Sequence, residues 1–158
     1  MTPLEFLPIG YALSVAIETA KAKHGIRIFN LSINVVQEVD ADKYDLLFIP
    51  GGSPDGAPST VRKIKKALEI TKSFFAKNKP VAAICHGPWL LVEADVVEGR
   101  TVTSWPSLRT DLENAGAEVI DREVVVDGNL ITSRKPQDIP AIVAAFKKAV
   151  SEAASIAA

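Results

Sequence analysis

The chain has 158 residues, enough for one domain with a sizeable core but little more. Hydrophobic residues make up 47% and charged residues 23%, a balance that excludes a disordered or collagen-like chain. Lys and Arg number 18 against 19 Asp and Glu, for a net charge of −1, so the basic excess expected of a nucleic-acid or anionic-membrane binder is missing.

Three features bear on cellular location and cofactors. The charge-free stretch from Phe6 to Ile17 is too short to span a bilayer and lacks the basic leader of a signal peptide. Cys85 is the single cysteine and cannot form an internal disulfide, which fits a reducing compartment. The two histidines, His24 and His86, are too few for a His-rich metal site. We therefore expect a soluble, cytoplasmic protein that uses no metal or other cofactor and no membrane or nucleic-acid partner.

The first predicted elements are strands. Ser14 to Ile17 and Ile26 to Leu31 are the best early candidates, and neither resembles the buried central strand that usually opens a doubly wound fold. Two apolar runs follow, Asp45 to Pro50, which is stopped by the pair Gly51-Gly52, and Val81 to Cys85. These runs do not alternate with polar residues, which is typical of a parallel sheet covered on both faces.

A long amphipathic helix is predicted between these two strands, from about Pro58 to Lys77. The residues predicted on its buried face are Val61, Ile64, Leu68, Thr71 and Phe75. Strand, helix and strand in this order form the right-handed crossover unit of α/β folds.

The second half of the chain alternates in the same way. A helix is predicted at Trp89 to Val97, a short strand at Thr101 to Ser104 and a helix at Ser107 to Ala115. Val124 to Thr132 is predicted to be a hairpin, because Asp127-Gly128 can supply the positive φ angles of a type I′ turn.

The last predicted helix begins near Asp138, a favourable N-cap residue. The residues of its predicted buried stripe are Ile139, Ile142, Val143, Phe146 and Val150. The small Ala/Ser-rich tail from Ala153 to Ala158 is expected to fray. We expect residues 1–158 to form a single domain.

Cys85 is the leading candidate for a catalytic residue. Small residues at Ala83 and Gly87 allow a sharp strand-to-helix turn, which lifts the side chain between them above the sheet edge. The N-terminus of the following helix favours an anion, so the pattern predicts a lowered pKa for the thiol. The alternative is a small core residue at a strand end, but the turn pattern favours the nucleophile.

Three further positions are candidates for the same edge of the sheet. His86 follows the cysteine and is either a general acid or base, or a surface histidine at a helix start. Gly51-Gly52 allows backbone N–H groups to approach a substrate carbonyl, as an oxyanion hole requires, although a plain tight turn is the simpler interpretation. Arg134 can bring a cation to this edge, but such arginines are more often solvated or structural.

These motifs resemble the ThiJ/PfpI superfamily, and particularly its PfpI, or intracellular-protease, branch. The resemblance runs roughly from Thr19 to Lys148. The matching segments are Lys23–Gly25, Ile49–Gly52, Lys79–Pro88, Thr103–Pro106, Asn114–Gly116, Glu123–Asn129 and Thr132–Pro136.

The resemblance implies a flavodoxin-like three-layer α/β sandwich with a mostly parallel sheet, assembled as a homodimer or a larger ring. It implies that Cys85 is the nucleophile with His86 beside it, and that backbone N–H groups of Gly52 and His86 form the oxyanion hole. Members of this superfamily are assigned as peptidases, as cofactor-free glyoxalases acting on 2-oxoaldehydes and as deglycases. Others act as chaperones or oxidation sensors.

The chain departs from the family pattern at its start and at two carboxylates. The usual first strand is missing, residues 1–18 are atypical, and Thr2 falls near the family's first glutamate. A second glutamate, which a neighbouring subunit often supplies to orient the histidine, corresponds to Ser59, with Asp55 as the nearest candidate to replace it.

Three hypotheses therefore remain open. The first is a cysteine-dependent enzyme acting at a carbonyl, either peptidase-like or glyoxalase- and deglycase-like. The second is a non-enzymatic oxidation sensor or chaperone that uses the Cys85 thiol. The third is an inactive, truncated chain whose true start lies upstream.

Overall fold

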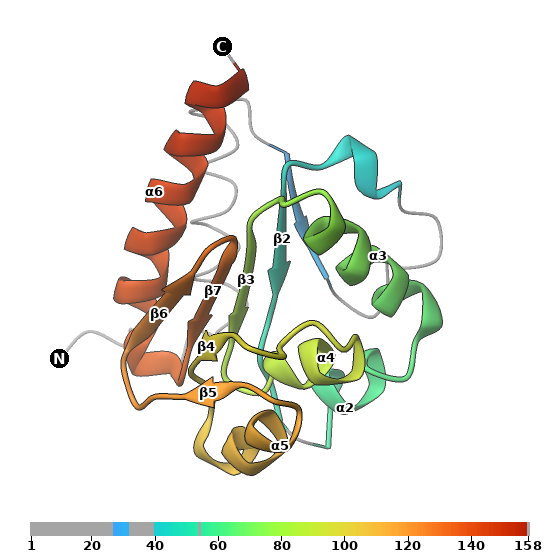
Figure 1. Ribbon diagram of the computed structural model, residues 1–158, viewed down its shortest axis with the longest axis vertical. Coiled ribbons are helices and arrows are strands. Elements are labelled where there is room, and N and C mark those ends of the chain that lie inside the picture. Colours follow the sequence, from blue (N-terminus) through green and yellow to red (C-terminus); the bar gives the residue numbers. More distant parts are fainter. Residues whose placement is uncertain (1–26, 32–39, 54, 158) are drawn as a thin grey trace, which may run out of the picture.

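The computed structural model describes residues 27–31, 40–53 and 55–157 (Figure 1). The strand predicted at Ser14 to Ile17 and the atypical segment 1–18 lie outside these residues. The described part is an α/β fold in which a mostly parallel sheet is flanked by helices, as predicted from the sequence. No helix within the described ranges combines the length and the apolar character needed to cross a membrane.

The main sheet has five strands in the order β1-β2-β3-β7-β6. The first four run parallel, and β6 pairs antiparallel with β7 at the edge. Their bounds are β1 Ile28–Asn30, β2 Leu46–Ile49, β3 Val81–Ile84, β6 Val124–Asp127 and β7 Leu130–Ser133. The register places Ile84 opposite Ser133, so β3 and β7 end side by side and the residues that follow them meet at one edge.

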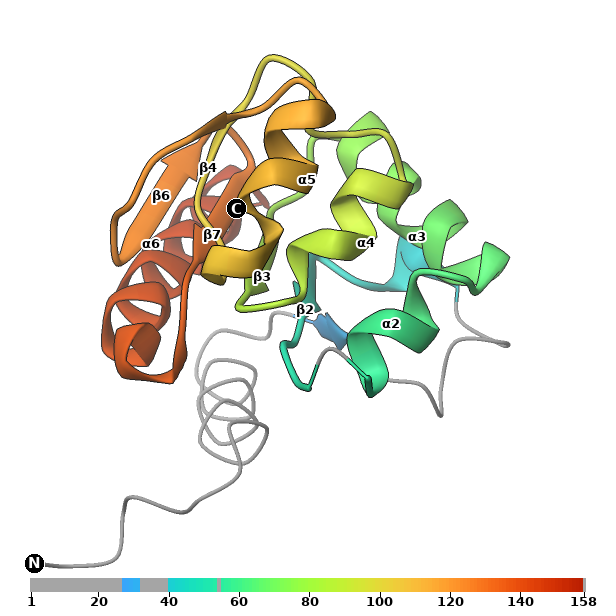
Figure 2. The ribbon, with the colours of Figure 1, turned by 90° about the horizontal axis from the view of Figure 1, so that it is seen from below.

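Helices cover both faces of this sheet (Figures 1 and 2). On one face lies α6 (Ile139–Ala157), whose Ile142, Phe146 and Val150 pack against alternate strand residues such as Phe48. The elements of the other face are α2 (Ala57–Val61), α3 (Lys65–Ala76), α4 (Pro88–Glu93) and α5 (Arg109–Asn114). Both faces of β2 and β3 are therefore buried, which explains their unbroken apolar sequence.

Short elements connect these layers. A two-stranded parallel sheet pairs β4 (Thr101–Val102) with β5 (Glu118–Val119). Single 3₁₀ turns are η3 (Ala41–Lys43), η4 (Pro106–Leu108) and η5 (Pro136–Asp138). The predicted strand at Thr101 to Ser104 thus ends two residues early, and its last two residues enter a loop that lies against the end of β3.

The helix predicted from Pro58 to Lys77 is wrong as a single element. The chain leaves α2 at Arg62 and resumes helix only at Lys65, because Ile64 is extended with φ −86° and ψ 109°. The break shifts the buried face of α3 away from the predicted stripe. The fully buried residues of α3 are Ala67, Ile70, Thr71 and Phe74, whereas the predicted Leu68 and Phe75 are half-buried.

Two other elements differ from the predictions. Helix α4 ends at Glu93 rather than Val97, and Asp95 beyond it has a positive φ of 56°. In the hairpin, Asp127 pairs with Leu130 inside the ladder, so the loop is Gly128-Asn129, and among these turn residues only Gly128 has a positive φ, 56°. A type I′ turn needs positive φ at both loop residues, so that turn type is not formed. Helix α6 continues to Ala157, and the fraying of the tail from Ala153 to Ala158 stays a prediction.

Candidate active site

The predicted turn after β3 is present and holds Cys85 in a conformation that side chains rarely adopt. Its φ is +62°, and the residue is only 6% exposed. Its backbone is fixed on both sides, since its N–H donates to the Ser133 carbonyl at 3.0 Å and its carbonyl accepts from the Trp105 N–H at 3.0 Å. Helix α4 starts at Pro88, three residues later. A rarely populated backbone conformation held by its surroundings is characteristic of functional sites.

Two glycines allow the turn to pack closely. A Cβ atom at Gly51 would lie 2.6 Å from the Cys85 Cβ, and one at Gly87 would lie 2.8 Å from the Ile49 carbonyl oxygen. Neither position has room for any side chain, because real Cβ atoms do not approach other atoms so closely. The end of β2 and the turn after β3 are therefore in backbone contact.

The Cys85 thiol is surrounded by the groups predicted for it. The backbone N–H groups of His86 and Gly52 hydrogen-bond to the cysteine, and His86 Nδ1 lies 3.3 Å from Sγ. The predicted lowering of the pKa is wrong for this structure, because burial raises the pKa of the Cys85 thiol and the two N–H groups oppose this only in part. Burial by the surrounding loops therefore outweighs the backbone donors at the turn.

His86 is a buried part of the site rather than a surface histidine. It is 5% exposed, and its ring stacks on Trp105 with centroids 5.6 Å apart and planes at 29°. Trp89 contacts it at 5.6 Å in a tilted arrangement, and Nε2 lies 3.5 Å from the Ser107 Oγ. Burial lowers the pKa of His86, opposed by a backbone hydrogen bond with Gly52, so the ring is neutral near pH 7.

The sequence did not single out Trp105 or Ser107. Trp105 lies in the segment Thr103–Pro106, which resembles the family, and this resemblance is the one feature of the sequence that could have indicated a role for it. Ser107 carried no signal, because a serine before a predicted helix is most simply a helix-start residue.

The two candidates for supporting roles are not brought to the thiol. Asp55 is exposed in a turn and makes no hydrogen bond or ion pair with any residue in the described part of the chain. Arg134 forms a two-bond pair with Asp138, with Nε–Oδ2 at 2.8 Å and Nη2–Oδ1 at 3.1 Å. It also bonds Asp121 at 2.8 Å.

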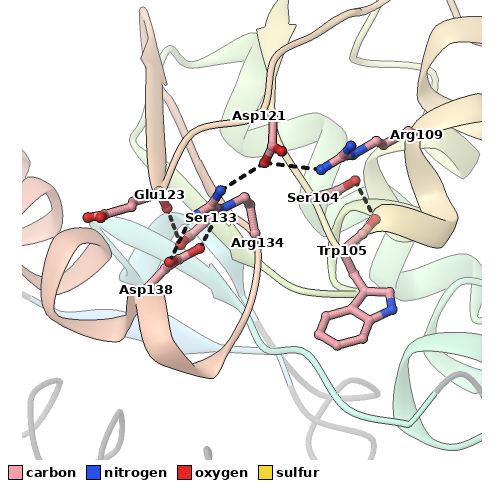
Figure 3. A network of polar contacts seen from close by, with 8 residues as sticks. All are labelled: Ser104, Trp105, Arg109, Asp121, Glu123, Ser133, Arg134 and Asp138. Atoms are coloured by element: carbon pink, nitrogen blue, oxygen red, sulfur yellow. Dashed lines mark hydrogen bonds and ion pairs between the residues drawn. The ribbon is translucent and has the colours of Figure 1, made fainter.

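The Arg134 contacts belong to a network at the end of β7 (Figure 3). Asp121 bridges Arg134 and Arg109, with Arg109 Nη2 at 3.1 Å. The bonds from Asp138 and Asp121 raise the pKa of Arg134, and the bond from Arg134 lowers the pKa of Asp121. The charges of Arg134, Asp138, Asp121 and Arg109 are thus paired with one another, which favours the structural interpretation of Arg134.

No grouping of three or more His, Cys, Asp or Glu side chains that could hold a metal occurs among the residues that the structure describes. The chemistry available at the turn is that of a thiol, an imidazole and converging backbone donors.

Comparison with known proteins identifies the family of this chain. Residues 5–149 match the model of the DJ-1/PfpI family. The chain belongs to the DJ-1/PfpI family. A deglycase of Thermococcus kodakarensis, TK1284, is 49% identical over 126 residues, which cover 80% of this chain and 73% of the relative. Deglycase PfpI of Pyrococcus furiosus is 46% identical over 127 residues with the same coverage. The resemblance to the PfpI branch is thereby confirmed.

A solved structure shows the same fold. It is a two-domain protein of Anabaena variabilis that contains DJ-1/ThiJ/PfpI-like and ferritin-like domains. The TM-score is 0.70 at 36% identity, and the match covers 73% of this DJ-1/PfpI chain but 32% of that one. The prediction of the flavodoxin-like α/β fold of this family is confirmed, and the chain spans about a third of that protein.

Proposed function

We propose that this chain is a cysteine-dependent enzyme that acts on reactive carbonyl compounds, a deglycase of the glyoxalase type whose substrates are 2-oxoaldehydes and their adducts. The observation that carries the proposal is the turn after β3, where Cys85 has a φ of +62° and its sulfur faces His86 Nδ1 at 3.3 Å. The name deglycase, carried by the relatives TK1284 and PfpI, supports the same reaction class.

In the first step the thiol and the imidazole act as a neutral pair. Because burial raises the pKa of Cys85 and lowers that of His86, the sulfur carries its proton until a carbonyl carbon arrives. The proton then moves to Nδ1 while the sulfur bonds to that carbon, and the carbonyl electron pair moves to the oxygen. In the proposed step, the N–H groups of Gly52 and His86, which hydrogen-bond to the cysteine, stabilise this oxyanion.

The second step needs no external oxidant. After the oxyanion takes the proton back from His86, the neutral imidazole removes the hydrogen from the sulfur-bound carbon as a proton and returns it to the neighbouring carbon. The hydroxyl proton of the first carbon moves to the oxygen of the neighbouring carbon. The first carbon is oxidised to a thioester and the second reduced to an alcohol. Water then cleaves the thioester to a 2-hydroxy acid and the free thiol. With an adduct as substrate, the amine or thiol of the adduct leaves with a proton from His86 when the sulfur replaces it.

The burial of the site favours small substrates over polypeptides. Cys85 is 6% exposed and His86 5%, so an extended peptide segment cannot reach the sulfur without displacing the surrounding loops, whereas a small carbonyl compound needs little space. For this reason we place the peptidase-like activity second.

The test is an assay of the full chain with methylglyoxal and, separately, with its adduct on N-acetylcysteine. We expect the 2-hydroxy acid to form from both, as followed by proton NMR, and the free thiol to be released from the adduct. A peptide substrate forms a second arm. Cys85→Ser is the control and should retain the circular dichroism spectrum but form no product. Equal product formation by this variant would overturn the proposal.

The non-enzymatic hypothesis of an oxidation sensor requires thiolate character, which the raised pKa of Cys85 works against. Intact-mass spectrometry after mild peroxide tests it, since a sensor gains two oxygen atoms on Cys85. Light scattering on the same sample tests the expected homodimer or larger ring. An inactive chain that also resists oxidation would favour the third hypothesis.

A further inference from the structure

The two nitrogens of the His86 ring face two different side chains. Nδ1 lies 3.3 Å from the Cys85 sulfur and Nε2 lies 3.5 Å from the Ser107 hydroxyl oxygen. Trp105 stacks on the ring and Trp89 contacts it at a tilt, both with centroids at 5.6 Å. The two indole contacts restrict the plane of the ring.

The proton on a neutral imidazole can reside on either nitrogen, and only one choice suits the reaction. For the thiol to give its proton to Nδ1, that nitrogen must be unprotonated, so the ring proton must be on Nε2. A backbone hydrogen bond of Gly52 also acts on His86 and opposes the lowering of its pKa.

The charged groups around the ring are engaged elsewhere. Asp111 of α5 accepts the Trp89 indole N–H at 2.8 Å. Arg62, which follows α2, lies 5.3 Å over the Trp89 ring and pairs with Glu93 of α4 at 2.9 Å. In the described ranges no carboxylate hydrogen-bonds to His86, and the side chain at Nε2 is that of Ser107. A neutral hydroxyl therefore stands where Cys-His and Ser-His sites commonly have an acid or amide.

We infer that Ser107 is a positioning residue for His86: its hydroxyl oxygen accepts a hydrogen bond from Nε2–H and so keeps Nδ1 free to take the Cys85 proton. This inference rests on the proposed function. Because the acceptor carries no charge, it stabilises the imidazolium less than a carboxylate would. Burial, which lowers the pKa of His86, keeps the ring neutral in the absence of substrate.

The tautomer itself can be measured on the full chain. Nitrogen-15 NMR of the labelled histidine rings, recorded above pH 6.5, the ordinary pKa of histidine, distinguishes Nε2–H from Nδ1–H. His24→Gln assigns the signals, since the chain has two histidines. We expect Nε2–H in the wild type, a shift toward Nδ1–H in Ser107→Ala and recovery in Ser107→Thr. Ser107 is exposed, so alanine fits without repacking.

A second readout is the rate at which iodoacetamide alkylates Cys85. We expect Ser107→Ala to slow it by about twofold to tenfold near neutral pH, the size of effect that the loss of one hydrogen bond produces, and Ser107→Thr to restore it. Ser151→Ala is the matched control, because that hydroxyl bonds only within α6, to the Lys147 carbonyl, and should change neither readout.

An unchanged tautomer in Ser107→Ala, or an unchanged alkylation rate, would overturn the inference. Neither readout requires turnover. A chain that fails the methylglyoxal assay but shows the tautomer shift would therefore refute the proposed function and leave the role of Ser107 intact.

Discussion

The ends of β3 and β7 lie side by side at one edge of the sheet, yet they carry opposite kinds of site. After β3 the thiol and the imidazole are buried and neutral, and the Cys85 sulfur lies 3.3 Å from His86 Nδ1. The backbone of Cys85 has a positive φ. After β7, Arg134 makes three charged hydrogen bonds, two to Asp138 and one to Asp121. The two regions are joined by the hydrogen bond from the Cys85 N–H to the Ser133 carbonyl.

This difference indicates that the turn after β3 carries the chemistry and that the network after β7 stabilises the fold. Charged side chains that pair with one another stabilise the local fold and are not available to react with a substrate. A nucleophile, in contrast, must be able to give up its hydrogen bonds when it bonds to the substrate. The Arg134 network fixes the turn between β7 and α6, and the carbonyl of the preceding residue anchors Cys85. We therefore expect substitutions after β3 to change the chemistry, and substitutions after β7 to change the stability.

The largest effect is expected at the nucleophile. Replacing Cys85 by alanine removes the atom that bonds to substrate, so the rate of methylglyoxal consumption should fall by at least about a hundredfold, while the fold is retained. The measurement is the NMR assay at equal concentrations of folded protein. The matched change after β7, Asp121→Asn, should leave the rate within a factor of about two. If both variants lost activity equally, the division between the two regions would be wrong.

The next effect is steric. In Gly51→Ala the new methyl group would lie 2.6 Å from the Cys85 Cβ and 2.9 Å from the Ile84 carbonyl oxygen, so the turn must move. We expect a loss of about 1–3 kcal/mol in the free energy of unfolding, measured with denaturant, together with slower alkylation of Cys85.

Gly99→Ala is the control for Gly51→Ala, because no atom lies within 4 Å of the position that its Cβ would take. Its φ is +72°, so it reports the cost of backbone strain without a steric clash. Normal alkylation in Gly51→Ala would show that the contact between β2 and the turn is unimportant for the site.

A smaller effect is expected from breaking the network. In Asp138→Asn the buried two-bond pair with Arg134 loses its charge, but the amide oxygen still accepts a hydrogen bond and Arg134 still pairs with Asp121, so the melting temperature should fall only modestly. The rate per folded molecule should stay near that of the wild type. Glu152→Gln, on the exposed end of α6, is the control and should leave the melting temperature unchanged. A large loss of activity in folded Asp138→Asn would mean that the Arg134 network takes part in catalysis and does not only stabilise the fold.

The sequence predicted those parts of the site that depend on local geometry. Gly51, Gly52 and Gly87 mark close backbone approaches, and an apolar strand before Cys85 indicates a turn at the carboxyl edge of the sheet. The geometry around His86 was not predictable in this way. Its orientation depends on Trp105 from another loop, and a contact between distant segments leaves no periodic signal in the sequence.

Two errors have a common cause in tertiary packing. The helix break at Ile64 contains neither glycine nor proline, so the amphipathic pattern continues through it and predicts one helix. The pKa of Cys85 was predicted from the helix terminus alone, whereas burial by the surrounding chain decides its direction. In both cases local propensity was overridden by contacts that only the folded chain supplies.

The smallest predicted effect is the pH dependence of stability, and it distinguishes the two regions without substrate. His86 has a lowered pKa, so its contribution is full above its ordinary value of 6.5 and is lost as the pH falls through the lowered value. Cys85 has a raised pKa, so its contribution is full below 9.0 and is lost as the pH rises through the raised value. Asp121, with a lowered pKa, contributes fully above pH 3.8 and loses its contribution as the pH falls through the lowered value.

Unfolding by denaturant across this pH range should therefore show a decline in stability at alkaline pH that Cys85→Ala reduces and Asp121→Asn leaves unchanged. An alkaline decline that persists unaltered in Cys85→Ala would mean that the thiol is not held neutral by burial, and that the reaction starts from a thiolate.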